Sequence, residues 1–250
     1  MTLSLAERRA DAVLIGLVDS GYGFSGSPPT GNDRVVASQA FRFDEGVVLT
    51  PVSKDQLGHG SALLEVIAGQ APAADFAIAQ IFTERLTTTP AQVAAAIDWL
   101  VEQQVDLINL SLGLRNDRDV LRSACERAVA AGVIVCASAP AKGDPVYPSA
   151  YPGVFRMTGD ARCSGPEQLS CLKTQYADFG GYVKARHGVI GASAGCAQLT
   201  GHIGRYLSEG GAADLAAVDR WLESQADYFG VEVRFPKATE SDSNNGGPIR

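Results

Sequence analysis

Three polar side chains that together could perform acyl transfer occur in short glycine-containing segments of the chain. Asp19 lies in Val-Asp-Ser-Gly, directly after the apolar residues 12–18, His59 lies in Gly-His-Gly-Ser, and Ser193 lies in Gly-Ala-Ser-Ala-Gly. Acyl transfer by serine needs a hydroxyl nucleophile, an imidazole that removes its proton, and a carboxylate that fixes the tautomer of the imidazole. We therefore predict that Asp19, His59 and Ser193 form a catalytic triad.

A structural role is the alternative interpretation of each residue. Asp19 or Ser193 could cap a turn or a helix, and His59 could be a buried, hydrogen-bonded histidine. The other two histidines, His187 and His202, lie in no comparable motif. We interpret these two as structural.

The segments between these residues alternate between apolar runs with strand character and stretches of helical periodicity. In residues 90–103, apolar residues recur three and four positions apart, which places them on one face of a helix. The predicted strands cover residues 12–18, 75–81, 106–110 and 133–137. One predicted helix begins after His59, and two others cover residues 90–103 and 120–131. This alternation predicts an α/β fold with a doubly wound, mostly parallel β-sheet flanked by helices.

The second half of the chain has a different composition. Residues 145–181 are rich in Pro, Gly and Tyr, which predicts loops and short antiparallel strands at one edge of the sheet. A helix is expected after Ser193, and residues 212–228 have the pattern of a further amphipathic helix. We expect one domain over residues 1–235, without a long propeptide, and a polar, flexible tail over residues 236–250.

Composition argues against several classes of protein. The formal net charge of -7 and the pI near 5.0 disfavour a broad basic surface for nucleic acid or anionic lipid. No stretch reaches the roughly 18 to 20 apolar residues that cross a bilayer. Arg8 and Arg9 precede the apolar residues 12–18, but Asp11 interrupts this segment and no small-residue cleavage site follows, which favours a buried strand over a targeting sequence.

The five cysteines favour a reduced, cytoplasmic location. Cys125, Cys136, Cys171 and Cys196 lack the close spacing to a histidine that zinc sites have. We expect neither a metal nor a cofactor. Cys163 and Cys171 flank a loop and would be able to form a local disulfide in an exported protein, although unpaired thiols are the favoured interpretation.

Further motifs accompany the three candidate catalytic residues in a fixed order. They are Val-Asp-Ser-Gly at 18–21, Gly-His-Gly at 58–60, Asn-Leu-Ser-Leu-Gly at 109–113, Ala-Gly-Val-Ile-Val at 131–135, Tyr-Pro at 147–148 and 151–152, and Gly-Ala-Ser at 191–193. Together they resemble the successive signatures of the subtilase family of serine peptidases, over about residues 12–204. The resemblance implies a catalytic Asp, His and Ser at the carboxyl ends of strands of a doubly wound sheet. It also implies that Ser111, Leu112 and Gly113 form an extended segment that pairs with the substrate backbone, whereas Asn109 is interpreted as a structural strand residue.

The region expected to bind the oxyanion departs from the family pattern. Subtilases usually carry an asparagine after the strand predicted at 133–137, and its side-chain amide donates to the oxyanion, whereas this chain has Ala141 near that position. Loss of one such donor costs about 10²–10³ in turnover. The backbone N–H of Ser193 remains as one donor. Ser138, Lys142 or a backbone N–H are the candidates to replace the other.

The resemblance, together with the expected absence of a long propeptide, implies a serine endopeptidase, specifically a dedicated intracellular processing enzyme that removes a leader peptide from a precursor protein. The expected partner is that peptide or precursor; neither nucleic acid nor a membrane is expected, and no oligomeric state is predicted. Because the asparagine is missing, the alternative is a subtilase-like scaffold that binds a peptide or partner protein with weak or no cleavage. A nucleotide-binding α/β protein is disfavoured, since no phosphate-binding glycine-rich sequence follows the first predicted strand.

Overall fold

The computed structural model describes residues 6–7, 9, 11–25 and 31–232 of the 250-residue chain. A ten-stranded sheet in the order β10-β8-β9-β7-β6-β5-β1-β4-β2-β3 runs through these residues. Its strands are β1 (Leu14–Asp19), β2 (Val35–Phe43), β3 (Val47–Thr50), β4 (Asp75–Gln80), β5 (Leu107–Leu110), β6 (Ile134–Ser138), β7 (Val154–Gly159), β8 (Leu169–Cys171), β9 (Phe179–Gly181) and β10 (Tyr228–Phe229). Among the described strand pairs only β2–β3 and β8–β9 are antiparallel, so the sheet is mostly parallel.

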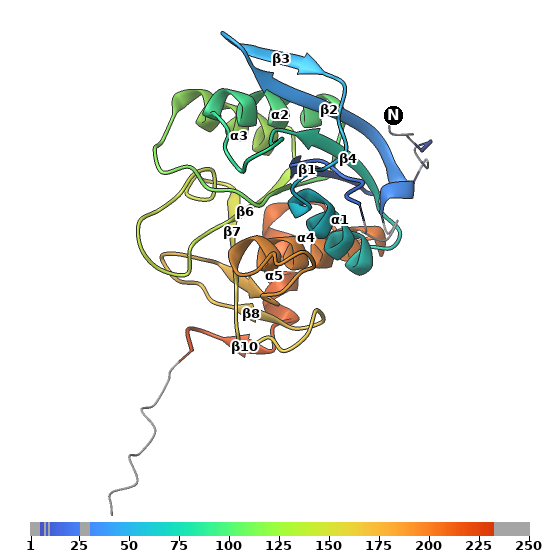
Figure 1. Cartoon of the computed structure of the whole chain (residues 1–250). Coiled ribbons are helices and arrows are strands. Elements are labelled where there is room, and N and C mark those ends of the chain that lie inside the picture. Colours follow the sequence, from blue (N-terminus) through green and yellow to red (C-terminus); the bar gives the residue numbers. More distant parts are fainter. Residues whose placement is uncertain (1–5, 8, 10, 26–30, 233–250) are drawn as a thin grey trace, which may run out of the picture.

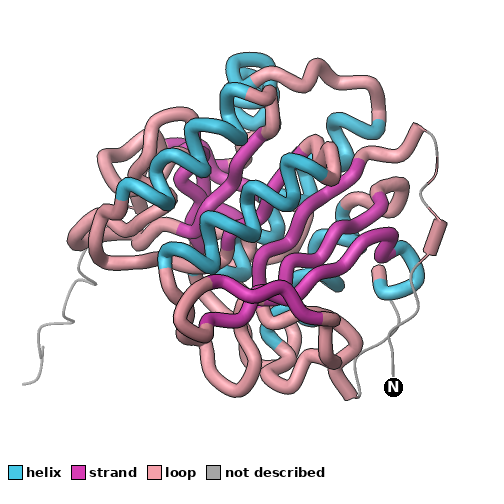
Figure 2. Tube along the Cα trace, turned by 90° about the horizontal axis from the view of Figure 1, so that it is seen from above, coloured by secondary structure: helices cyan, strands magenta, loops and turns pink. Residues whose placement is uncertain are grey.

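Helices cover both faces of the sheet. Figure 1 shows α2 (Pro90–Glu102) and α3 (Asp119–Ala130) on one side, and α1 (His59–Gln70), α4 (Ala192–Ser208) and α5 (Leu215–Ser224) on the other. Seen from above, the central strands run side by side with helices lying across them (Figure 2). The predicted doubly wound α/β fold is confirmed.

The central strand β1 shows why the sequence forms this sandwich. Its side chains alternate between the faces of the sheet, as the two-residue repeat of a strand requires. Ile15 and Leu17 are buried in the core beneath α1 and α4, whereas Leu14 and Val18 are buried in the core beneath α2 and α3. A continuous apolar run is therefore needed where both faces of a strand are covered.

Side chains cap the N-termini of α2 and α5, and both caps are residue types that commonly begin helices. At α2, Thr89 and Gln92 form a reciprocal capping box, and Pro90 occupies the first turn. At α5, Asp214 accepts a hydrogen bond from the Ala217 N–H at 2.9 Å. The predicted helix at 212–228 is therefore shorter than expected, because its cap lies at Asp214 and its last residues turn into β10.

The expectation for residues 145–181 is wrong in one respect. This region contains β7, a six-residue strand that lies inside the sheet and pairs in parallel with both β6 and β9. Arg156 in the middle of β7 interrupts the apolar pattern that is typical of an internal strand. The guanidinium of Arg156 is paired at 2.5 Å with the carboxylate of Asp178, the residue before β9. The short antiparallel pair β8–β9 lies toward the edge, as predicted, with β10 outside it.

Other parts of the chain add to or fall outside these expectations. The antiparallel hairpin of β2 and β3 at the opposite edge of the sheet was not predicted. The predicted tail at 236–250 lies outside the described residues. No helix within the described ranges is long and apolar enough to span a membrane.

Candidate active site

Asp19 is the last residue of β1 and is fully buried. One carboxylate oxygen, Oδ1, accepts a hydrogen bond from the Ser20 N–H at 2.7 Å and lies 2.8 Å from Nδ1 of His59. The other oxygen, Oδ2, is buried without a hydrogen-bond partner among the described residues. Burial leaves His59 as the side-chain partner of this carboxylate, so the pair is geometrically specific.

His59 is the first residue of α1, and the glycines beside it have defined reasons. Gly58 caps the helix with a left-handed backbone (φ 72°). A Cβ atom on Gly60 would lie 2.4 Å from the carbonyl oxygen of Gly21, which only glycine avoids. The close approach is completed by the Gly60 N–H, which donates to Ser20 Oγ at 2.8 Å. The start of α1 is thereby held against the turn that follows Asp19.

Asp55 is a site residue that the sequence analysis missed. Its Oδ1 accepts hydrogen bonds from the N–H groups of Leu57 and Gly58, and its Oδ2 accepts from the N–H and the hydroxyl of Ser61, all at 2.8–2.9 Å. This buried carboxylate therefore fixes the loop and first turn on which His59 sits. An aspartate four residues before the histidine, in a segment that precedes a helix, was the available signal.

Electrostatics raise the pKa of His59 above its ordinary value of 6.5. Burial by itself would lower this pKa, because it disfavours the charged imidazolium. The negative charge and hydrogen bond of Asp19 outweigh burial, and the charge of Asp55 adds to their effect. Since Nδ1 faces Asp19, Nε2 is the nitrogen left to accept a proton from a nucleophile.

Ser193 is the second residue of α4, after Gly191 with a φ of 73°. Its N–H belongs to the first turn, whose N–H groups lack partners within the helix and carry the positive end of the helix dipole. Its hydroxyl donates to the carbonyl oxygen of Ser111 at 3.2 Å. The hydroxyl must therefore turn from Ser111 to His59 before it can lose its proton.

One pocket of about 320 Å³ contains both His59 and Ser193. We call it the triad pocket; its other walls are Phe82, residues 86–88 and residues 111–114. The structure therefore brings together Asp19, His59 and Ser193, which the sequence separates by up to 174 positions. It also places the predicted substrate-binding residues Ser111, Leu112 and Gly113 in the same pocket.

The two side chains considered as replacement oxyanion donors do not line the triad pocket. Ser138 is buried at the end of β6, and its hydroxyl donates to the carbonyl oxygen of Leu112 at 3.3 Å. Ala141 and Lys142 are exposed in the turn that follows β6. The structure thus presents the Ser193 N–H as the donor beside the nucleophile and assigns Ser138 to the support of the 111–113 segment.

Asn109 links the nucleophile helix to the sheet, in agreement with its predicted structural role. Its Oδ1 accepts hydrogen bonds from Thr200 Oγ1 at 2.9 Å and from Cys196 Sγ at 3.4 Å. Its Nδ2 donates to Ser111 Oγ at 3.0 Å, and that hydroxyl donates to the carbonyl oxygen of Ser193 at 3.2 Å. This network, buried except at Ser193, fixes the backbone of Ser193 from below. The sequence analysis missed Thr200, whose polar side chain on a buried helix face was the only signal.

The remaining histidines do not line the triad pocket. His202 is buried, Nε2 lies 2.9 Å from the carbonyl oxygen of Pro166, and burial lowers its pKa. The ring of His187 packs against Phe24 with centroids 4.9 Å apart. No group of three or more His, Cys, Asp or Glu side chains in the described part of the chain is arranged to hold a metal ion.

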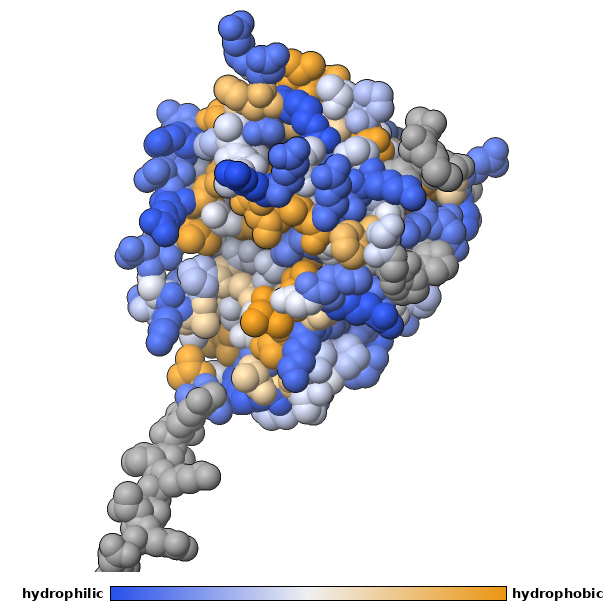
Figure 3. Space-filling model, viewed as in Figure 1, coloured by the Kyte–Doolittle hydropathy of each residue, from blue (hydrophilic) through white to orange (hydrophobic). Residues whose placement is uncertain are grey.

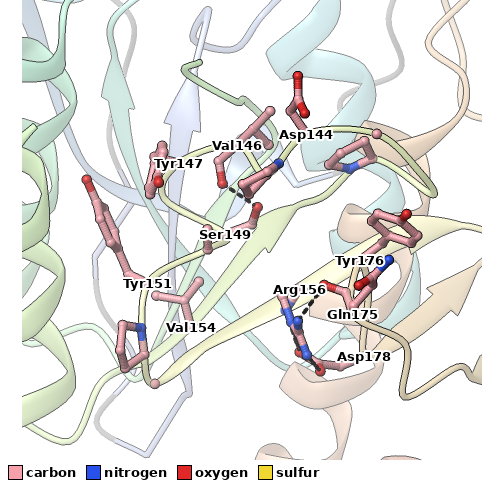
Figure 4. A pocket seen from close by; sticks show the side chains of 16 residues that line it. Asp144, Val146, Tyr147, Ser149, Tyr151, Val154, Arg156, Gln175, Tyr176 and Asp178 are labelled. Carbon is pink, nitrogen blue, oxygen red and sulfur yellow. Dashed lines mark hydrogen bonds and ion pairs between the residues drawn. The ribbon is translucent and has the colours of Figure 1, made fainter. Parts of the chain in front are cut away.

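Figure 4 shows a larger cavity, of about 770 Å³, whose lining residues include neither His59 nor Ser193. It lies next to the triad pocket, since Tyr147 in its wall pairs with Leu114 in the wall of that pocket. Its walls include the 143–147 turn, Tyr151 and the ion pair of Arg156 with Asp178. We call it the outer cavity. Size alone does not identify it as the active site, because the titratable groups arranged for proton transfer lie in the smaller pocket.

Comparisons with known proteins agree with this geometry. The Subtilase family model, Peptidase_S8, matches residues 12–159. The subtilisin-like protease het-Q2 of Podospora anserina is 36% identical over 107 residues, which cover 39% of this chain and 29% of that protein. Subtilisin E of Bacillus subtilis (strain 168) is 26% identical over 207 residues, covering 74% of this chain and 54% of that protein. In eight curated relatives, these two included, the matched segment spans between 19% and 55% of the relative's length.

Solved structures share the fold. Sphericase superposes with a TM-score of 0.66 at 17% identity, covering 88% of this chain and 84% of that one. The nisin leader peptidase NisP from Lactococcus lactis has a TM-score of 0.65 at 17% identity, covering 85% and 82%. Since the family match extends over more than half of the 250 residues, the chain belongs to the subtilase family.

Proposed function

We propose that this protein is a serine endopeptidase. His59 Nε2 accepts the proton of the Ser193 hydroxyl, and the Ser193 oxygen attacks a peptide carbonyl carbon. The proton then passes to the leaving amine, and water hydrolyses the acyl-enzyme with His59 again as the base. Asp19 orients His59 and stabilises its positive charge. The observation that carries this proposal is the 2.8 Å contact of buried Asp19 with His59, which lines the same pocket as Ser193.

The substrate we propose is a precursor protein from which a leader peptide is removed in the cytoplasm. Fold similarity to NisP, a nisin leader peptidase, and to a lanthipeptide protease with a TM-score of 0.60 supports this class of substrate. One candidate precursor is the small subunit of quinohemoprotein amine dehydrogenase. The triad pocket adds a chemical preference, since Phe82, Leu86, Leu112 and Leu114 give it an apolar wall for a substrate side chain.

Covalent labelling with a fluorophosphonate tests the activity without knowledge of the substrate, because the reagent requires an activated serine. Wild-type protein should be labelled at Ser193, whereas Ser193→Ala should lose labelling and lower peptide cleavage by about 10⁶-fold. Ser208→Ala is the matched control, since Ser208 lies on the same helix but is exposed. Well-folded wild-type protein that stays unlabelled would instead favour a peptide-binding scaffold, to which the missing asparagine points.

The substrate class needs a separate experiment. Wild-type protein and Ser193→Ala are incubated with candidate precursor proteins, and new termini are identified by mass spectrometry. A single new terminus that forms with wild type only supports leader removal. Cleavage at many sites in unrelated unfolded proteins would contradict a dedicated processing role while leaving the peptidase activity intact.

A further inference from the structure

Val146 packs against the substrate-facing segment from the side of the outer cavity. A Cβ atom built on Gly113 would lie 2.8 Å from Cγ2 and 3.1 Å from Cβ of Val146, so the valine side chain fills the space directly beside Gly113. Gly113 lines the triad pocket, whereas Val146 lines the outer cavity (Figure 4). Val146 therefore forms a partition between the two.

The backbone holds this partition in place on both sides. The next residue, Tyr147, exchanges two hydrogen bonds with Leu114, at 2.7 Å and 2.8 Å. The carbonyl oxygen of Val146 accepts hydrogen bonds from Ser149 Oγ at 2.9 Å and from the Ala150 N–H at 3.0 Å. The valine side chain is itself branched at Cβ, which restricts its rotamers. Moving Val146 aside would require breaking several of these contacts.

The position of Val146 matters because it lies near the place that the substrate residue bonded to Ser193 occupies in the acyl-enzyme. In the acyl-enzyme, the substrate carbonyl carbon is bonded to Ser193 Oγ, so the Cβ atom of that substrate residue lies two bonds from the ester carbon. Ser193 Oγ contacts the carbonyl oxygen of Ser111, and Gly113 follows two residues later, at most roughly 7 Å along the segment. A methyl group ends well before Gly113. A phenylalanine or leucine side chain that follows the segment reaches the space that Val146 occupies.

On the basis of the proposed peptidase activity, we propose that Val146 makes one subsite shallow, namely the subsite for the side chain of the substrate residue whose carbonyl carbon Ser193 attacks. The enzyme accordingly cleaves after glycine or alanine and rejects large side chains at that position. The apolar wall of the triad pocket, which includes Phe82 and Leu86, takes the larger side chain of a neighbouring substrate residue. Substitution of Val146 by a smaller residue joins the subsite to the outer cavity of about 770 Å³ and admits aromatic side chains.

Peptidyl diphenyl phosphonates test this inference directly. Two probes are compared, identical except that the residue bonded to phosphorus carries the side chain of alanine or of phenylalanine. Wild-type protein should react at least about tenfold faster with the alanine probe. Val146→Gly and Val146→Ala should shift the ratio of the two rates toward phenylalanine by about tenfold or more, the glycine variant further than the alanine variant.

Two controls separate this inference from the proposed function. Val154→Ala enlarges the same outer cavity away from Gly113, so it should leave the ratio of the two rates unchanged. Fluorophosphonate labelling, which does not depend on the subsite, is measured for every variant beside its thermal unfolding. If wild type is labelled by fluorophosphonate but reacts equally with both peptidyl probes, the subsite inference is wrong and the peptidase activity stands. If fluorophosphonate labels nothing in folded protein, the proposed function is wrong.

Discussion

At the scale of single residues, the site depends on a carboxylate and an imidazole that are buried together. Asp19 is fully buried and the His59 side chain is 14% exposed, so their 2.8 Å contact is shielded from most of the screening that weakens surface pairs. Asp55 adds a second negative charge beneath the same helix start. These groups raise the pKa of His59, whereas burial alone would lower it.

The raised pKa predicts a pH dependence of known sign. Proton acceptance from Ser193 needs neutral His59, so the rate of fluorophosphonate labelling should rise with pH and reach half its maximum above pH 6.5. Asp19→Asn removes the charge that raises the pKa, so the midpoint should move down while the maximal rate falls by about 10⁴-fold. An unchanged midpoint in Asp19→Asn would show that Asp19 does not set the pKa of His59.

The contribution of the same pair to stability should fall with rising pH, whereas the labelling rate should rise. A folded-state pKa above the ordinary value means that protonated His59 stabilises the fold fully below pH 6.5 and that this contribution is lost as the pH rises through the raised pKa. Denaturant unfolding of wild type and Asp19→Asn across this range measures the difference. The difference between the unfolding free energies of wild type and Asp19→Asn should become smaller as the pH rises through the raised pKa of His59.

At the scale of elements, the site depends on how closely α4 approaches the sheet. A Cβ atom on Gly195, two residues after Ser193, would lie 2.1 Å from the carbonyl oxygen of Thr158 in β7. The Asn109 network ties the same helix to β5. Small residues and buried hydrogen bonds therefore set the height of the Ser193 hydroxyl above the strand ends.

Two glycine-to-alanine substitutions in helices should have opposite effects. Gly195→Ala should lower the free energy of unfolding by about 3 kcal/mol or more, because backbone atoms of β7 cannot move aside cheaply. Gly69→Ala in α1 meets no atom within 4 Å and has helical backbone, so it should raise stability by about 0.5–1 kcal/mol. Urea unfolding of both variants measures this. Equal losses of stability would show that backbone contact with β7 is not the cause.

At the scale of the whole molecule, two apolar cores sandwich the sheet and contain four of the five cysteines, all except Cys163. All five cysteines of the chain lie in the described residues, and each is buried and unpaired. Cys163 and Cys171 thus form no disulfide, in line with the favoured interpretation. On the face seen in Figure 3, apolar residues occur in separate groups among hydrophilic side chains. Phe43 and Leu49 on the β2–β3 hairpin are two of the exposed apolar residues of the described part of the chain.

Burial of the thiols predicts their reactivity. Burial raises the pKa of Cys125, Cys163 and Cys196 to about 12, so thiolate is scarce at pH 8. Folded protein should react with Ellman's reagent far more slowly than free cysteine does, whereas protein unfolded in guanidinium chloride should release colour for five thiols. A cysteine that reacts in folded protein as fast as the free amino acid would contradict the packing described for it.

Much of the fold was predictable because its signals are local. Apolar runs and helical periodicity predicted the central strands and the helices between them. β7 and the β2–β3 hairpin were not, because Arg156 in β7 and the polar residues Ser38, Gln39 and Arg42 in β2 interrupt the apolar pattern of these strands. The pairing of half-buried Arg156 with an aspartate twenty-two residues away has no local signature.

The sequence by itself determined the family, the central sheet and the identity of the three candidate catalytic residues, since each is written in short motifs whose order along the chain is informative. Only the tertiary structure decided what surrounds them. Asp55, Thr200 and Val146 act through contacts that depend on how helices and loops pack, such as the bond between Thr200 and Asn109 across 91 positions. Distances between such residues are set by long-range packing, which no spacing along the chain specifies.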